Sequence, residues 1–426
     1  MNGMDSEAIV EERRATALPA FAGYGIELEY VIVDRATLDV RPIADQLLVD
    51  SSGATDGSVQ RGSMGWSNEL VAHLIEIKST RPEPALAPLA RRFHGEVAAV
   101  NAALASYGAC LMPSGMHPWM NPAMETTLWT LSDTPIYQAF DRLFDCRRHG
   151  WANLQSMHVN LPFADDREFA RLHAAIRVVL PIVPALCASS PIADGSITPF
   201  ADYRLEAYRT NATRVPSITG DVIPDDVDGK RDYFRAILDP MFRDIAPLDD
   251  GGVLRYEWLN ARGAIARFDR NAIEVRLCDT QECPRADLAV AAAVAAVVRC
   301  GYDERLMSIE RQRGYETPRL AAILRSCIRD ADRTVVDDTD YLRAFGLRTH
   351  AVRAIDIWRH VLAQCRDEVD RLNASASEPL DAILRHGPLG RRILRACGGQ
   401  PDRGRLRAVY RRLCECLSED AIFVDR

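Results

Sequence analysis

Four segments of the chain alternate apolar and polar residues, which is the pattern of a β-strand with one buried face. The first, GYGIELEYVIVD at residues 23–34, carries Glu27 and Glu29 two positions apart between apolar neighbours. Side chains on a strand alternate between faces, so the two carboxylates are predicted to point the same way. That face is either simply solvated, or something positive lies in front of it.

Three later segments repeat this design of an apolar back and a polar front. They are residues 71–78, with Glu76 and Lys78 on the front, residues 155–161, with His158 and Asn160, and residues 271–278, with Glu274 and Arg276. An antiparallel sheet with one face on helices and the other face open produces such alternation. We therefore expect an α+β fold, in which an antiparallel sheet has an open acidic face and is backed by helices.

Helical spacing of apolar residues fills much of the remaining chain, above all its C-terminal third. The predicted helices span residues 83–107, 166–187, 285–313, 318–331, 350–372, 378–397 and 403–417. Residues 204–216 and 218–229 are rich in Thr, Asn, Asp, Pro and Gly and are predicted to be loops. We expect an N-terminal tail (1–20), a catalytic sheet domain (21–300) and a helical region (301–426) packed on the same domain.

Composition and charge narrow the class of protein. A formal charge of -8 over 426 residues, without a basic block, argues against nucleic acid as the partner. The longest apolar run, residues 288–298, is too short to cross a membrane, and the first twenty residues lack a secretory apolar core. A cytoplasmic location is expected. The helical C-terminal region is predicted either to pack behind the sheet or to form a homo-oligomer contact.

The basic residues limit the ways in which this chain could bind phosphate. Lys78 and Lys230 are the only lysines, and no G-x-x-x-x-G-K-[ST] phosphate loop occurs. Any phosphate must therefore be bound by arginine, backbone amides or metal ions.

The polar fronts of the four strands are unusually acidic as a set. Each motif alone is more typical of a solvated face or a cross-strand ion pair. If the strands are neighbours, however, the carboxylates of Glu27, Glu29, Glu76 and Glu274 gather around His158, and repulsion raises their pKa values. Divalent cations remove that conflict, and such a ligand set suits Mg²⁺ or Mn²⁺. The residues thus indicate a metal-dependent, ATP-using enzyme in which Arg276 stabilises a transferring phosphoryl group.

Several motifs, in order, resemble those of glutamate–cysteine ligase family two, the bacterial carboxylate–amine ligases. They are GIELEY, LIEIKST, PSGMHP, MHVNLPF, SSPIADGS with YRLEAYRTN, and NAIEVRLCDTQ, and they cover about residues 20–300. The C-terminal AILRHGPLGRRILRA and LRAVYRRLCECL are also similar to the helical end of these ligases. The resemblance implies a cup-shaped antiparallel sheet related to that of glutamine synthetase.

The resemblance also implies an activity and residue roles. The expected reaction forms an acyl phosphate from ATP and a carboxylate, and an amine then displaces the phosphate; glutamate and cysteine are the expected pair. The implied Mg²⁺ ligands are Glu27, Glu29, Glu76, His158 and Glu274. Arg276 would face the transferring phosphate, with Glu274 beside it in the catalytic set. The candidates for binding substrate or ATP are Arg204, Arg209, Asn160, Arg147 and Arg148.

The substrates stay open at this stage. Relatives read G-V-E-E-E or H-V-H where this chain has Gly25–Glu29 and His158–Asn160, so the sequence lies between subtypes. A ligase of the same mechanism acting on another amine in peptide or secondary metabolism is one alternative. A guanidino kinase, a metal hydrolase and a non-catalytic ligand-binding homologue are others.

Overall fold

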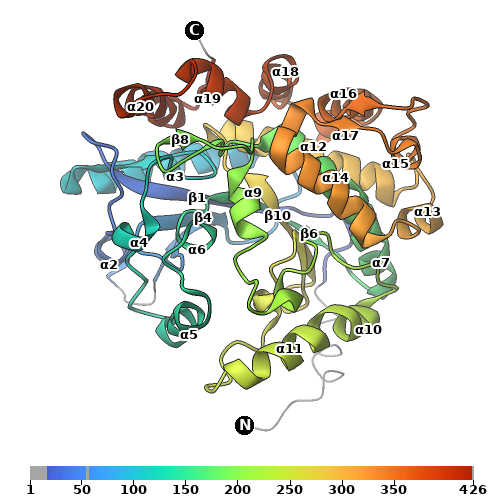
Figure 1. Cartoon of the computed structure of the whole chain (residues 1–426), viewed down its shortest axis with the longest axis horizontal. Coiled ribbons are helices and arrows are strands. Elements are labelled where there is room, and N and C mark those ends of the chain that lie inside the picture. Colours follow the sequence, from blue (N-terminus) through green and yellow to red (C-terminus); the bar gives the residue numbers. More distant parts are fainter. Residues whose placement is uncertain (1–16, 54–56, 425–426) are drawn as a thin grey trace.

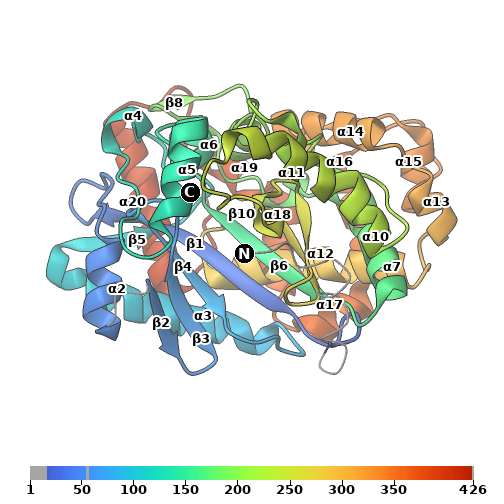
Figure 2. The same cartoon turned by 90° about the horizontal axis from the view of Figure 1, so that it is seen from below.

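A computed structural model describes residues 17–53 and 57–424. Within these residues, an eight-stranded antiparallel sheet runs in the order β2-β3-β4-β1-β6-β10-β9, and β5 also pairs with β1. Its strands are β1 (Gly25–Asp34), β2 (Ser58–Arg61), β3 (Met64–Asn68), β4 (Leu74–Ser79), β5 (Ala109–Met112), β6 (Ser156–Pro162), β9 (Ala264–Arg267) and β10 (Ala272–Asp279). Figure 2 looks onto this sheet, with α5 and α11 at its edges. The antiparallel sheet predicted from the sequence is confirmed.

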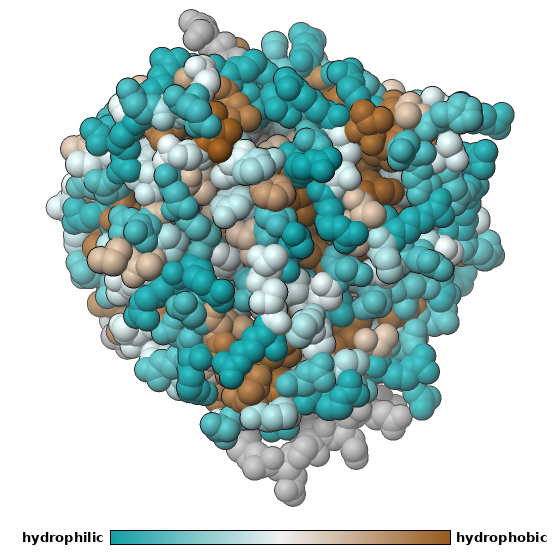
Figure 3. Space-filling model, viewed as in Figure 1, coloured by the Kyte–Doolittle hydropathy of each residue, from teal (hydrophilic) through white to brown (hydrophobic). Residues whose placement is uncertain are grey.

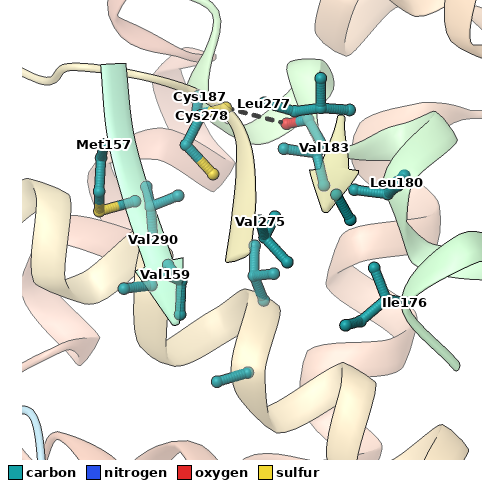
Figure 4. Packing of buried hydrophobic residues seen from close by; sticks show 14 of the residues in the cluster. Met157, Val159, Ile176, Leu180, Val183, Cys187, Val275, Leu277, Cys278 and Val290 are labelled. Carbon is teal, nitrogen blue, oxygen red and sulfur yellow. Dashed lines mark hydrogen bonds between the residues drawn. The ribbon is translucent and has the colours of Figure 1, made fainter. Parts of the chain in front are cut away.

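Helices cover the apolar back of the sheet. The long ones are α3 (Ala87–Leu104), α7 (Asp166–Val179) and α12 (Pro284–Tyr302), and α12 packs on the other two. Figure 4 shows Met157 and Val159 of β6 and Val275 of β10 packed with Val290 of α12. The apolar side of β1, which includes Ile26 and Leu28, is buried in the same core, so the alternation in the sequence reports the two faces of the sheet.

The remaining helices surround the sheet and form the C-terminal region. They are α2 (Ala44–Ser52), α4 (Pro122–Glu125), α5 (Thr134–Phe144), α6 (His149–Ala152), α8 (Pro184–Cys187), α9 (Tyr203–Tyr208), α10 (Lys230–Tyr233), α11 (Asp239–Ile245), α13 (Ile309–Arg313), α14 (Thr317–Asp330), α15 (Thr339–Ala344), α16 (Ala354–Gln364), α17 (Arg366–Leu372), α18 (Ser377–His386), α19 (Leu389–Cys397) and α20 (Arg403–Glu419). Two further sheets of two short strands pair β7 (Ile192–Ala193) with β8 (Ser196–Ile197) and β11 (Val335–Val336) with β12 (Val352–Arg353).

The C-terminal helices lie together along one side of the molecule (Figure 1). α18 packs on α12, and α20 packs on α3 and β5. On α19, the buried Arg392 pairs with the buried Glu282, just beyond β10, and its Nη1 donates to the Phe423 carbonyl at 2.7 Å. This contact joins Phe423, near the end of the described residues, to the segment just after β10, the strand that carries Glu274 and Arg276.

Several predicted boundaries were wrong for local physical reasons. The predicted loop 204–216 begins with helix α9, because Asp202 caps it by accepting the Leu205 N–H at 2.9 Å. The strand predicted from Val71 begins only at Leu74. The predicted helix 378–397 is divided at Gly387, whose φ of 82° is left-handed, and at Pro388.

Two more predicted helices are broken, and part of the predicted tail lies outside the described residues. The helix predicted for 285–313 is interrupted after Tyr302, where Glu304 adopts a φ of 57°. The helix predicted for 350–372 becomes α16 and α17. Of the tail predicted for 1–20, residues 1–16 are not among those described.

The surface is mainly hydrophilic on the face shown in Figure 3, with apolar residues in small patches. Across the described ranges, none of the helices has both the length and the apolar character required to span a bilayer.

Candidate active site

Strand pairing brings the predicted acidic residues into one row on the open face of the sheet. Glu27 lies opposite Lys78 on one side and His158 on the other, and Glu29 lies opposite Glu76. Glu274 lies opposite Asn160. Residues that are far apart in the chain therefore become cross-strand neighbours.

His158 lies at the centre of this acidic row. Its Nδ1 is 3.1 Å from a Glu27 carboxylate oxygen and 3.6 Å from Glu274 Oε1, and its Nε2 is 3.7 Å from Glu29 Oε1. Burial opposes a charged imidazole, but the hydrogen bond with Glu27 and the charges of Glu29 and Glu274 outweigh it and raise the pKa of His158 to about 9. Without a metal ion the ring is thus held as a cation among carboxylates, and a bound metal ion would replace one of its ring protons.

Ser156 and Asn160 fix the acids on either side of the imidazole. Ser156 donates its N–H and its hydroxyl to Glu29 Oε2 at 2.7 and 2.9 Å, and its Oγ is 2.9 Å from His158 Nε2. The Asn160 amide donates to Glu27 Oε1 at 3.1 Å. Both glutamates therefore have defined orientations before any ligand binds.

Glu274 is held by two arginines. Its Oε1 is 2.9 Å from Arg276 Nη2, and its Oε2 is 3.1 Å from Arg267 Nη1. Burial works to raise the pKa of this carboxyl, but the charges of Arg276, His158 and Arg267 together outweigh it and lower the pKa, contrary to the upward shift expected from repulsion among the acids. Glu274 is consequently an anion with 1% of its surface exposed.

Glu69, which sequence analysis missed, completes the acidic row. It directly follows β3, and its carboxylate belongs with those of Glu29 and Glu76 to a group whose ligand atoms all lie within 4.8 Å of one another. Burial, followed by the charges of Glu29 and Glu76, raises the pKa of Glu69 well above its ordinary value. Only its place directly after a strand, at the turn leading to β4, marks it in the sequence.

The donor set fits a divalent cation. Glu27, Glu76 and His158 form a second group within the same 4.8 Å limit. Burial and then the Glu27 charge raise the pKa of Glu76, although Lys78 Nζ lies 2.7 Å from its Oε1. Glu69 and Glu76 are crowded enough to favour their protonated forms, and together with the neighbouring carboxylates and one imidazole they form a ligand set that suits Mg²⁺ or Mn²⁺.

A cavity of about 190 Å³ opens beside Glu29. Aromatic side chains form much of its wall, and two arginines reach it; the lining includes Glu69, Tyr137, Trp151, Arg204, Tyr208 and Arg276. Its volume suits a molecule the size of one amino acid and falls below the roughly 300 Å³ at which drug-sized ligand sites begin.

A buried network positions Arg204 at this cavity. Its Nε pairs with Asp279, and its Nη2 donates to the Leu277 carbonyl at 2.7 Å. Asp279 also accepts the Ser189 N–H at 2.7 Å and the Ser190 hydroxyl at 2.8 Å. Only 2% of the Arg204 side-chain surface is exposed. Its guanidinium is therefore fixed before any substrate arrives.

A β-bulge in β10 makes this arrangement possible. The register with β6 shifts between Val275 and Cys278, so Leu277 has no partner there and its carbonyl accepts Arg204 instead. The Arg276 N–H donates to the Gly263 carbonyl at 3.0 Å. The bulge thus helps to position both arginines that line the cavity, Arg204 and Arg276.

The structure does not bring the other predicted arginines to the acidic row. Arg209 pairs with Glu206 of its own helix at 2.5 and 2.6 Å and is absent from the cavity wall. Arg147 and Arg148 line a separate cavity of about 430 Å³. Helices α6 and α9 lie between the two cavities, packed so closely that a Cβ on Gly150 would lie 2.6 Å from the Ala207 carbonyl oxygen.

Comparisons with known proteins identify the family of the chain. The profile of glutamate-cysteine ligase family 2 matches residues 24–412, so the chain belongs to that family. An uncharacterised protein of Archaeoglobus fulgidus is 36% identical over 280 residues, which cover 66% of this chain and 75% of the archaeal protein. A protein of Bradyrhizobium diazoefficiens, provisionally named glutamate–cysteine ligase 2, is 28% identical over 65% of this chain and 58% of its own length, so the match spans little more than half of that relative.

Among solved structures, the glutamate–cysteine ligase of Francisella tularensis in complex with AMP is similar in fold. The TM-score is 0.58 at 11% identity, covering 95% of this chain and 90% of the other. At that identity the likeness concerns the fold alone. The predicted family and fold class are confirmed.

Proposed function

We propose that the protein is an ATP-dependent carboxylate–amine ligase, with glutamate and cysteine as the first substrate pair to test. Family membership supports the class of reaction. The observation that carries the proposal is the acidic row of Glu27, Glu29, Glu76 and Glu274 around His158, beside a small cavity that holds Arg204 and Arg276.

In the proposed reaction, an oxygen of the substrate carboxylate attacks the γ-phosphorus of ATP. The bond between that phosphorus and the bridging oxygen breaks, and ADP leaves with the electron pair. The amine nitrogen then attacks the carbonyl carbon of the acyl phosphate, a C–N bond forms, phosphate leaves, and the amine loses a proton. The product is an amide, γ-glutamyl if glutamate is the carboxylate.

The residues have distinct proposed tasks in these steps. Arg276, held by Glu274, faces the transferring phosphoryl group, where a fixed cation stabilises developing charge. Arg204 binds a substrate carboxylate, for which its guanidinium geometry is suited. Mg²⁺ or Mn²⁺, held by Glu27, Glu29, Glu69, Glu76, His158 and Glu274, would neutralise phosphate charge. In this proposal the sheet domain (21–300) supplies the site, and the helical region that follows residue 300 packs on the same domain.

Replacing Glu274 tests the proposal directly. Glu274→Gln keeps the shape but removes the charge that holds Arg276, so ADP release with Mg²⁺, glutamate and cysteine should fall by about a hundredfold or more. Glu415 on α20 is exposed, so Glu415→Gln is the matched control and should retain wild-type turnover. Full activity of Glu274→Gln would contradict the proposed site.

A substrate screen separates the proposed ligase from its alternatives. Wild-type protein is assayed for ADP release with amino acids crossed with amines. A ligase requires both substrates for full turnover. Release that is independent of any amine would indicate a kinase or a hydrolase, and binding without release would indicate a non-catalytic homologue.

A further inference from the structure

Several cysteine thiols of this molecule meet in pairs. The chain has eleven cysteines, all of them within the described ranges and all of them free thiols. In three pairs the two thiols lie within hydrogen-bonding reach of each other: Cys110 with Cys414, Cys187 with Cys278, and Cys300 with Cys365. The members of each pair are far apart in the sequence, so each pair marks a place where the fold packs two elements together.

Access to solvent separates one pair from the other two. Both members of the other two pairs are buried, with no more than 1% of their surface exposed. Cys110 on β5 and Cys414 on α20 are partly exposed, and Cys416 is the only other partly exposed cysteine among the eleven. Residues two positions apart on a helix do not share a face, so Cys416 points away from the direction of Cys414. A reagent in solution can therefore reach one thiol pair.

The surroundings of Cys110 favour its reactive form. The Cys414 thiol donates a hydrogen bond to the Cys110 sulfur, and together with the charges of Arg35 and Arg411 this bond outweighs burial and lowers the pKa of Cys110. Arg411 is held there because its guanidinium donates to the Arg35 and Ala36 carbonyls at 3.2 and 2.8 Å. The thiolate is the nucleophilic form of cysteine, and nearby cations stabilise it. Cys110 is thus the attacking thiol of the pair.

We propose that Cys110 and Cys414 are a modification site, at which a small disulfide such as cystine converts them into a reversible disulfide bond. The Cys110 thiolate attacks one sulfur of cystine, the cystine S–S bond breaks, and one cysteine leaves as its thiolate. Cys414 then loses its proton to solvent and attacks the Cys110 sulfur, and the second cysteine leaves with the electron pair. Two protein thiols are oxidised, and one cystine is reduced to two cysteines.

The fold makes this bond consequential for the C-terminal region. Cys110 lies opposite Val33 of β1, the strand that carries Glu27 and Glu29. Helix α20 packs on β5 without any covalent link. The two thiols already touch, so the sulfurs need only approach to the roughly 2.05 Å of an S–S bond. The disulfide would fasten α20 to the sheet and restrict the unfolded chain, which stabilises the folded state.

Cystine treatment of the wild-type protein tests the site without any assay of ligase turnover. After treatment, remaining thiols are alkylated in urea and peptides are identified by mass spectrometry. The expected product has two thiols fewer and one cross-link, between the peptides of Cys110 and Cys414. Its thermal unfolding midpoint should rise by about 3 °C or more, and dithiothreitol should reverse the shift. Wild-type protein that keeps all eleven thiols, or forms a cross-link at a buried pair, would overturn the proposal.

Three variants assign the roles of the two thiols. Cys414→Ser removes the second step, so Cys110 should retain one half of cystine as a stable mixed disulfide. Cys110→Ser removes the attacking thiol, and Cys414 should then react at least about tenfold more slowly than Cys110 does in Cys414→Ser. Cys416→Ser, also on α20, is the matched control and should form the cross-link like wild type. Equal reaction rates in the first two variants, or loss of the cross-link in Cys416→Ser, would contradict this assignment.

Discussion

Two clusters of buried charge in this molecule are built on opposite plans. Behind the sheet, Glu282 meets one arginine, Arg392, and the two also bond to the Phe423 backbone. On the open face, by contrast, the carboxylates of Glu29, Glu69 and Glu76 have ligand atoms within 4.8 Å of one another, and burial and mutual repulsion raise the pKa values of Glu69 and Glu76. Paired charges join helices to the sheet, whereas carboxylates crowded in this way either hold a proton or bind a cation.

The largest predicted effect concerns the paired cluster. Arg392→Met leaves Glu282 buried without its partner and should lower the free energy of unfolding by about 3–5 kcal/mol, measured by urea denaturation. Adding Glu282→Gln to this variant should restore part of the loss, because the unpaired charge is removed. If the double variant is no more stable than Arg392→Met, the pair does not act through its charge.

An intermediate effect is expected from pH, through the partly buried Glu257, whose carboxylate accepts the Phe268 N–H at 2.9 Å. Burial and then the Asp269 charge raise the pKa of Glu257 to about 7, against 4.5 for an ordinary glutamate. The folded state thus binds this proton more tightly than the unfolded state, and the stability it adds at low pH is lost as pH rises from about 4.5 through about 7. In the Glu257→Gln variant, the stability measured by thermal unfolding should fall less over this pH range, by on the order of 2 kcal/mol. An unchanged pH profile would place the titration elsewhere.

The smallest effect is expected within the acidic row itself. Because burial and its acidic neighbours already favour the protonated form of Glu69, Glu69→Gln should change the free energy of unfolding in EDTA by less than about 0.5 kcal/mol. The same variant should gain less thermal stability from added Mn²⁺ than wild type does. A large loss in EDTA would mean that this acid is structural, like Glu282, and would weaken the contrast between the clusters.

The sequence predicted those parts of the site that depend on strand alternation. Glu27, Glu29, Glu76, His158 and Glu274 were found because each lies on the polar face of a strand, and antiparallel pairing then brings them together. Glu69 was missed because it follows β3 in a turn, where no alternation marks it. Ser156 was missed because a serine shows its role only through its partners, Glu29 and His158.

The arginines show where local patterns fail. Arg204 and Arg209 stand five positions apart in one segment, and sequence alone gave them equal standing. In the structure, Arg204 is buried and pairs with Asp279, whereas Arg209 pairs with Glu206 of α9. Arg147 and Arg148 were placed near substrate by sequence, yet the packing of α6 against α9 puts them on another cavity. Such distinctions depend on tertiary contacts that no short motif encodes.

The bulge in β10 has an evolutionary consequence. Since the shift between Val275 and Cys278 is what frees the Leu277 carbonyl, losing a single codon there would restore ordinary pairing with β6 and remove the acceptor that Arg204 uses. Most point substitutions on this strand alter one group, but that deletion would misplace two guanidiniums at once. Lineages that keep the chemistry should therefore tolerate changes of residue in this stretch more readily than changes of length.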